Sequence, residues 1–229
     1  MEIAEDGSLE IIVSRTRQPG NWLPMEEDTN SITVRQTFQD RSGEQAAELR
    51  IERIDARESR PAPLTAETLQ KGLMGAVMFV QGSAGLFEQW AESFLPHVNE
   101  LPPADQAYCQ SIGGDPNIYY FHSAWRLAED EVLVIEAPEI PECQTWNFQL
   151  DNWWMESLDY RHHTIHVNKH TAHYEAVGSV RLVVSHSDPG LPNWIETAGH
   201  DMGTMCWRWI GADRHPPVAT RVMKLAELQ

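Results

Sequence analysis

The chain has 229 residues, a hydrophobic share of 41% and a formal charge of −17, from 17 Lys and Arg against 34 Asp and Glu. This length and hydrophobic share are typical of one large or two modest folded domains. Because the acidic excess repels a nucleic-acid backbone and an anionic membrane surface, we exclude both classes of partner.

The location of the protein is predicted from its termini, its apolar stretches and its cysteines. The longest apolar stretch, Leu73 to Val80, is far shorter than the roughly 20 residues that cross a bilayer. The N-terminal sequence MEIAEDGSLE is acidic, unlike a signal peptide. The odd number and wide spacing of Cys109, Cys143 and Cys206 are typical of reduced thiols. We therefore expect a cytoplasmic protein.

Three strand patterns occur twice along the chain. Residues 7–14, 31–38 and 49–54 have β-branched or alternating character, which predicts strands. The same patterns return at 180–185, 204–210 and 221–225, and both copies begin with Gly-Ser and contain Asn-Trp. The sequence therefore predicts a duplicated three-strand unit.

A helical region is predicted between the two copies. The segment from Arg57 to Pro63 reads as a linker because it is rich in Pro and charge. Thr65 is a helix cap for a first helix through about Phe79, and Ser83 a cap for a second that ends before Pro102. We expect a helical hairpin, followed by further strands at 118–127, 132–136, 145–150 and 164–167.

These elements predict three parts of the chain. Residues 1–60 form a partial first β unit, residues 61–104 a helical hairpin with its linker, and residues 105–229 a complete second β unit. Three strands alone leave an exposed sheet face and two open edges. We therefore expect residues 1–54 to be completed by a second copy of the chain, as a homo-oligomer, or by another partner chain.

The run YRHHTIHVNKHTAHYEAVGSVRLVVSHSDPGLPNWIETAGHDMGTMCWRW, with its DPGLPNW and TAGH elements, resembles the family named domain of unknown function 1214 (DUF1214), which often occurs beside DUF1254. The resemblance is best over residues 117–227. It implies an antiparallel β-sandwich of jelly-roll type with helices at its side, and it implies no reaction. The expected fold class is thus mainly β, a jelly-roll-like antiparallel β-sandwich with a helical hairpin and a duplicated three-strand unit.

Five histidines lie within twelve residues, at positions 162, 163, 166, 170 and 173. The β-branched residues among them favour an extended chain, in which side chains four positions apart are about 13 Å apart. Three such imidazoles cannot bind one ion, so we favour a polar strand face and predict no cofactor. The alternative is a metal bound through His186, His200 or the run 162–173 together with other ligands.

The corner from Asp188 to Trp194 has turn-forming residues in an order that predicts a rigid scaffold. His186, Asp188 and His200 have no equivalent in the first copy, so any site is expected in the second. A His-Asp pair could supply a general base, and no Ser or Cys has the context of a nucleophile. The catalytic candidates are His170, His200 and Asp188.

Ligand-binding candidates combine aromatic and polar side chains near the second copy. An Arg between aromatic residues can hold a carboxylate, although ion pairs with nearby acidic residues such as Asp159, Asp213 and Glu156 are the favoured alternative for the arginines. Likewise, Trp146, Phe148 and Leu150 are more simply one buried face of a strand. The candidates are Trp153, Arg161, Asn168, Asn193, Trp194 and Arg208.

Two functions stay open on this evidence. The first is binding of a small organic molecule, aromatic or apolar and with or without a carboxylate, in a β-sandwich pocket, with or without His-based acid/base chemistry. If the protein is an enzyme, a lyase, isomerase or hydrolase without a nucleotide cofactor is expected, because the phosphate-loop and dinucleotide motifs are missing from the sequence. The alternative is a structural or assembly subunit whose first β unit another chain completes.

Overall fold

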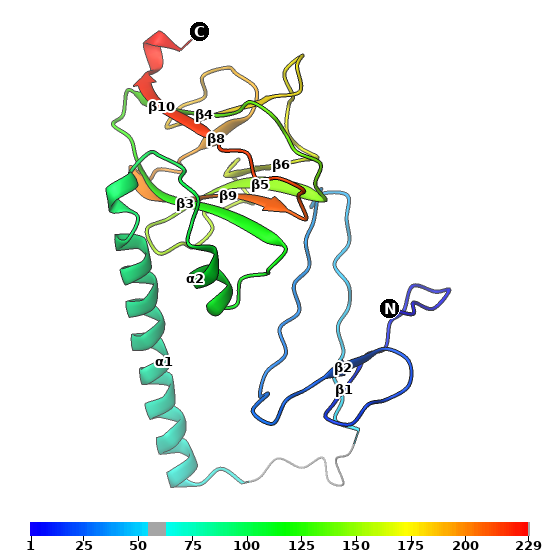
Figure 1. Cartoon of the computed structure of the whole chain (residues 1–229). Coiled ribbons are helices and arrows are strands. Elements are labelled where there is room, and N and C mark those ends of the chain that lie inside the picture. Colours follow the sequence, from blue (N-terminus) through cyan, green and yellow to red (C-terminus); the bar gives the residue numbers. More distant parts are fainter. Residues whose placement is uncertain (55–62, 229) are drawn as a thin grey trace. The chain divides into compact units, whose positions relative to one another are not determined.

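The computed structural model describes residues 1–54 and 63–228, and the chain divides into two compact units, Met1–Phe38 and Gln39–Gln229 (Figure 1). The predicted linker at 57–63 lies almost wholly outside the described residues. The predicted boundaries near residues 60 and 104 stay a prediction.

The first unit contains two short parallel strands, β1 (Ile12–Ser14) and β2 (Trp22–Pro24). The strands predicted at 31–38 and 49–54 are wrong, because both segments run outside any named strand. Alternating side chains make a segment suitable for a sheet edge, but a strand forms only where a second backbone accepts its hydrogen bonds. Ile32 and Ile51, two of the apolar residues of these segments, are exposed.

The second unit is built on two four-stranded sheets, drawn one above the other in Figure 1. One has the order β10-β4-β7-β8 and the other the order β3-β9-β5-β6. All neighbours are antiparallel except β7 and β8. The strands are β3 (Ile118–Arg126), β4 (Glu131–Ala137), β5 (Thr145–Asp151), β6 (His166–Asn168), β7 (Val180–Ser185), β8 (Trp194–Glu196), β9 (Met202–Ile210) and β10 (Ala219–Lys224).

The mainly β fold with antiparallel sheets is confirmed. Inward-facing residues of both sheets, such as Leu182 from β7 and Trp207 from β9, belong to one apolar core. Trp146 stacks on Trp207 with ring centroids 4.7 Å apart and nearly parallel planes. Trp146, Phe148 and Leu150 are all fully buried, so the prediction that they form one buried strand face is confirmed. The jelly-roll topology stays a prediction.

The helical hairpin is wrong, because one continuous helix, α1 (Ala66–Glu92), occupies this region. Thr65 caps its start as predicted, accepting a bond from the Thr68 backbone N–H. Ser83 does not begin a second helix: its hydroxyl donates to the Phe79 carbonyl one turn earlier, so the backbone continues through it. Two short helices follow, η1 (Leu95–His97) and α2 (Gln106–Ser111), and η2 (Leu225–Glu227) lies near the C-terminus.

Helix α1 is exposed along nearly its whole length. Ala91 is the one buried residue of this helix, while Leu73, Val77 and Phe79 are among its exposed apolar residues. A helix with apolar residues on all sides is normally covered by other structure. In the described part of the chain, α1 included, no helix has both the length and the apolar character needed to cross a bilayer.

The strand pairs β1–β2 and β7–β8 share their register and their hydrogen bonds. Ile12 pairs with Trp22 as Val183 pairs with Trp194. The N–H of Ile12 donates to the Asn21 carbonyl, and the N–H of Val183 donates in the same way to the Asn193 carbonyl. This equivalence covers two short strands in each copy, and the duplication of a three-strand unit stays a prediction.

Candidate functional site

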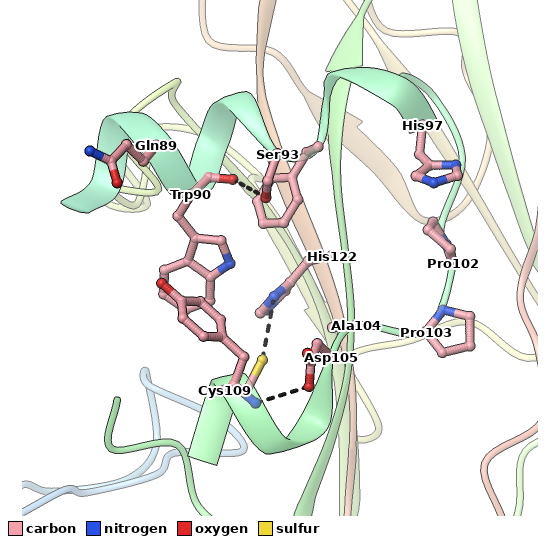
Figure 2. A pocket seen from close by; sticks show the side chains of 12 residues that line it. Gln89, Trp90, Ser93, His97, Pro102, Pro103, Ala104, Asp105, Cys109 and His122 are labelled. Atoms are coloured by element: carbon pink, nitrogen blue, oxygen red, sulfur yellow. Dashed lines mark hydrogen bonds between the residues drawn. The ribbon is translucent and has the colours of Figure 1, made fainter. Parts of the chain in front are cut away.

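A cavity of about 490 Å³ opens where the end of α1, η1, α2 and the edge strand β3 meet. Figure 2 shows Trp90 of α1 and Ser93, which caps the C-terminal end of this helix, with Cys109 of α2 below and His122 of β3 pointing in between them. This volume lies in the range of pockets that take small organic molecules. All of its lining residues belong to the second unit.

Two local features hold the walls of this cavity in place. Asp105 caps α2, because its carboxylate accepts a bond from the Tyr108 N–H at 3.0 Å. The side chain of Gln106 then bonds to both the N–H and the carbonyl of Tyr120 on β3, at 3.0 and 2.8 Å. Helix α2 is thus fixed to the open edge of the strand that carries His122.

Aromatic rings surround His122 on three sides. Trp90 meets it edge-on with ring centroids 5.6 Å apart, and Phe94 and Tyr120 lie 5.7 and 5.4 Å away. Tyr108 contacts Trp90 edge-on at 5.5 Å, which continues the aromatic wall toward α2. Such a wall offers a ligand a large apolar contact area with few polar groups.

Two ionisable groups of the cavity, His122 and Cys109, are held in their neutral forms. His122 is 6% exposed, and burial, with a contribution from Arg208, lowers the pKa of its imidazole to about 3. Burial, followed by the negative charge of Asp105, raises the pKa of the Cys109 thiol. The Cys109 sulfur lies 4.0 Å from His122 Nδ1. At neutral pH this pair is a thiol and a neutral imidazole, which is a poor arrangement for a thiolate nucleophile.

The other ring nitrogen of His122 is available to a ligand. No described protein group bonds to His122 Nε2. A neutral imidazole can donate or accept one hydrogen bond there, depending on its tautomer. The cavity therefore combines an apolar wall with one polar group of adjustable direction.

Asn168 and Asn193, two of the predicted ligand-binding residues, hold loops through their side chains. Asn168 Oδ1 accepts bonds from the N–H groups of His170 and Thr171, and its amide donates to the Gln39 carbonyl. Asn193 has a φ of 55° and bonds to both the N–H and the carbonyl of His173. The backbone of His170 is thus held by the side chain of Asn168, and the backbone of His173 by the side chain of Asn193.

The three predicted catalytic residues, His170, His200 and Asp188, are exposed. Asp188 caps its own turn by accepting a bond from the Gly190 N–H at 2.8 Å. In the described part of the chain, no hydrogen bond or ion pair joins these three side chains to one another. Their catalytic role stays a prediction.

Arg161 and Arg208, both predicted to bind a ligand, differ in their partners. Arg161 forms an ion pair with Asp159 at 2.9 Å, which confirms the favoured alternative for this residue. For Arg208 that alternative is wrong in the described part of the chain, because its one hydrogen bond there goes to Asn147 Oδ1 at 3.1 Å.

The two tryptophans of the predicted set lie half-buried outside the cavity. Trp194 donates to the Ser185 carbonyl at 3.4 Å. Trp153 lies in the turn after β5. Neither residue lines the cavity that the structure contains.

The histidine run is extended only at β6, where His166 begins the strand. His163 pairs with Glu196 at 2.9 Å. Both ring nitrogens of His186 are occupied, by Thr197 Oγ1 at 2.9 Å and by the Leu127 carbonyl at 3.2 Å. The described residues contain no group of three or more His, Cys, Asp or Glu side chains placed to hold a metal. Metal binding by this region was the less favoured prediction, and it stays one.

Sequence reasoning missed the cavity and its central residue. The sequence did place Trp90 and Phe94 on a helix and His122 on a strand. One signal was present in the sequence: His122 lies within a predicted strand of mostly apolar and aromatic residues, and Asp105, a helix cap, precedes it by 17 positions. No pattern in the sequence showed that these segments meet at one place, since Trp90 and His122 are 32 positions apart.

Comparison with known proteins gives a family and a related structure. Residues 1–38 match the family described as protein of unknown function (DUF1214). The crystal structure of an uncharacterized protein from Burkholderia cenocepacia is 58% identical, with a TM-score of 0.94 over 100% of this chain and 63% of that one. The chain therefore spans less than two thirds of the length of that relative.

A second structure, the VPA0106 protein from Vibrio parahaemolyticus, is 15% identical, with a TM-score of 0.41 over 71% of this chain and 47% of that one, and no argument rests on it. A search of the curated proteins gave no match.

The family match lies over residues 1–38 rather than over 117–227, where the resemblance was expected. These first residues contain the Asn21-Trp22 corner whose hydrogen bonds recur at Asn193-Trp194. The predicted resemblance to DUF1214 is therefore confirmed by a match of the family model over residues 1–38.

Proposed function

We propose that the protein binds a small, neutral, aromatic or apolar organic molecule in the cavity formed by α1, η1, α2 and β3. The observation that carries this proposal is a cavity of about 490 Å³ with Trp90, Phe94 and Tyr108 in its wall and a buried, neutral His122 inside it. A ligand ring stacks or meets the wall edge-on, and a hydroxyl or amide group bonds to His122 Nε2.

The charge of the cavity favours a neutral ligand. The carboxylate of Asp105 lies in its lining, and His122 carries no positive charge at neutral pH to attract an anion. An imidazole with a pKa of about 3 is also a weak base, because catalytic bases work best with a pKa near the operating pH. Binding is therefore better supported in this cavity than acid/base catalysis.

The test is a titration of the isotope-labelled chain with neutral aromatic probes, such as phenol and indole, followed by NMR. We expect saturable shifts of signals from residues lining the cavity. His122→Gln should weaken phenol binding about tenfold or less, since one neutral hydrogen bond contributes about 0.5–1.5 kcal/mol. Trp90→Leu should weaken binding of both probes.

Matched controls come from the exposed histidines. His170→Gln and His200→Gln change the same side chain outside the cavity, so binding should not change. If these two variants lose binding and His122→Gln does not, the site predicted from sequence around His170, His200 and Asp188 is the better proposal. Saturable shifts confined to residues outside the cavity would also reject our assignment.

A second candidate function is assembly, and a comparison of two strands favours it. Strand β7 lies between β4 and β8, whereas the equivalent strand β1 pairs only with β2 among the described residues. We infer that another chain supplies an antiparallel strand to the open edge of β1, as β4 does for β7. A second copy of this chain is the simplest source to test.

Val13→Pro tests this assembly directly. The Ile12 N–H donates toward β2, so the Val13 N–H points to the opposite, open edge, and proline removes that donor. Sedimentation at micromolar concentration should show self-association for the natural chain and monomers for Val13→Pro. A natural chain that is monomeric in this measurement would contradict assembly with a second copy.

A further inference from the structure

Three polar side chains lie side by side on the outer face of the sheet β3-β9-β5-β6. Arg208 on β9 is directly opposite Tyr120 on β3 and Asn147 on β5. Their sequence neighbours Phe121, Trp207 and Trp209 point to the core, so the three face away from it. Directly opposite residues have Cβ atoms about 4.5–5.5 Å apart. The three side chains therefore form one continuous polar row.

The bonds within and around this row occupy acceptor atoms. Asn147 Oδ1 accepts from Arg208 Nη1 at 3.1 Å. The Tyr120 hydroxyl oxygen accepts from the Asp115 N–H at 3.3 Å. What these bonds leave without a partner in the described chain are donors: the other guanidinium N–H groups, the Asn147 amide N–H groups and the Tyr120 O–H.

These donors are open to solvent and keep their protons. Tyr120, Asn147 and Arg208 are each half-buried, so the row is not sealed inside the protein. Burial raises the pKa of Tyr120, so its phenol stays protonated at neutral pH. Three neighbouring residues thus present several free donors around one positive charge, a pattern that can bind an anion.

The positive charge of Arg208 is not matched by a carboxylate in contact with it. The described ion pairs of the chain do not include Arg208. Asp151 lies on the same face, opposite Thr204. The charge of Arg208 acts to lower the pKa of Asp151, but the two side chains form no ion pair in the described chain. Asp151 is instead bonded to Gln149 and is 4% exposed.

We propose that Arg208, Asn147 and Tyr120 form a binding site for the carboxylate group of a small organic acid. One guanidinium matches a carboxylate in charge and in fork geometry, whereas a phosphate brings more negative charge to a chain that already carries −17. None of the three residues lines the cavity proposed above, although the Tyr120 ring lies 5.4 Å from His122. Arg208 alone was a candidate from the sequence, and the row adds the two neutral donors.

The experiment is an NMR titration of the labelled full chain with sodium benzoate at neutral pH, with sodium chloride at equal ionic strength as the reference. Signals of residues 120, 147 and 208 should shift and saturate. Arg208→Gln removes the charge and should weaken benzoate binding about tenfold or more, since hydrogen bonds to charged groups contribute about 1.5–3 kcal/mol. Tyr120→Phe should weaken it less.

Two controls keep the proposal falsifiable. Arg161→Gln removes an exposed arginine that is paired with Asp159, and its benzoate affinity should equal that of the natural chain. Arg208→Lys keeps the charge but loses the planar fork, so it should bind with intermediate affinity even if Arg208→Gln folds poorly. Equal affinities of the natural chain and the Arg208 variants, or the lack of a saturable shift at these residues, would overturn the site.

A second anion separates the ligand classes. Inorganic phosphate in place of benzoate should bind more weakly, and tighter phosphate binding at the same residues would contradict the carboxylate assignment. Phenol binding to Arg208→Gln should be unchanged. The two probes therefore test the two sites separately. If the natural chain binds phenol but not benzoate, the carboxylate site fails and the cavity stands. If it binds benzoate but not phenol, the cavity fails and the carboxylate site stands.

Discussion

Residues 2–24 and 173–196 form the same hydrogen-bonded corner in two different surroundings. Asn21 Oδ1 accepts from the Glu2 N–H and Asn193 Oδ1 from the His173 N–H. Ser14 and Ser185 each donate to the carbonyl two residues further on. The surroundings differ, because Leu182 is fully buried in the second corner whereas the equivalent Ile11 is 44% exposed in the first.

This comparison separates local from tertiary causes. The corner forms wherever its own Asn, Ser and Trp residues are present, because its bonds connect residues within 20 positions of one another. Burial of its apolar side chains depends on a neighbouring strand and an opposing sheet, which only the second copy has in the described structure. The same sequence pattern therefore has equal hydrogen bonding but unequal burial in its two positions.

The largest difference is expected between Leu182→Ala and Ile11→Ala. Leu182→Ala should lower the free energy of unfolding of the second unit by about 2–5 kcal/mol, because it leaves a cavity in the core. Ile11→Ala should cost less than about 1 kcal/mol, because the side chain is already exposed. Urea unfolding of both variants measures this. A large loss for Ile11→Ala would show that another strand covers the first corner.

The next largest effect is expected for Asn193→Ala, which should lower the free energy of unfolding of the second unit by about 2–4 kcal/mol. Its side chain makes bonds to His173 and Arg181, each worth about 0.5–1.5 kcal/mol, and alanine is disfavoured at a φ of 55°. Asn21→Ala is the matched control, and it should leave the melting of the second unit unchanged. If both variants shift that transition equally, the two corners do not unfold independently.

Asp151→Asn should stabilise the second unit by on the order of 1–3 kcal/mol at neutral pH. Burial, opposed by the Gln149 bond and Arg208, raises the pKa of Asp151 from 3.8 to about 6. A raised carboxyl pKa makes the folded state bind the proton more tightly, so its cost to stability appears as pH rises from about 3.8 through 6. The stabilisation of Asp151→Asn relative to the natural chain should therefore be constant above that pH range and vanish below it.

Unfolding of the natural chain and of Asp151→Asn across this pH range provides the measurement. Burial lowers the pKa of His122 to about 3, and this has the opposite effect on stability. The stability contribution of His122 is lost as pH drops from about 6.5 toward 3. This contribution is common to both proteins and cancels in their difference. A difference that does not vary with pH would contradict the raised pKa of Asp151.

The smallest effect is expected for Ser185→Ala, which should lower the free energy of unfolding by about 0.5–1.5 kcal/mol. The buried hydroxyl of Ser185 donates to the Ser187 carbonyl at 2.7 Å. Ser14→Ala removes the equivalent bond to Thr16 at a half-buried position, and should cost less because water can replace the hydroxyl there. Thermal unfolding of the two variants compares them, and an equal cost would show that burial does not separate the corners at this position.

Most strands of the second unit were predicted from the sequence to within about two residues, but β8 (Trp194–Glu196) was not predicted as a strand. Residues 180–185 form β7 as expected, and 145–150 agree with β5 apart from one residue at the end. Their dense β-branched and aromatic side chains are also the ones that the core buries, so local pattern and tertiary packing agree. The segments at 31–38 and 49–54 have the same kind of pattern without a partner, and there the prediction failed.

The candidate sites were predicted only in part, since Arg208 was named but the cavity around His122 was not. A cavity depends on how segments distant in sequence approach one another, here α1, α2 and β3. The same holds for the donor row, because Tyr120, Arg208 and Asn147 become neighbours only through the order and register of three strands.

The sequence by itself determined the acidic charge, the mainly β character and the Asn-Trp corners, because each depends on composition or on bonds between nearby residues. The tertiary structure decided which corner is buried, that α1 continues through Ser83, and which polar groups meet. These features depend on long-range contacts: a strand needs an edge to pair with, an apolar side chain needs an opposing surface, and a binding site needs side chains from several elements at one place.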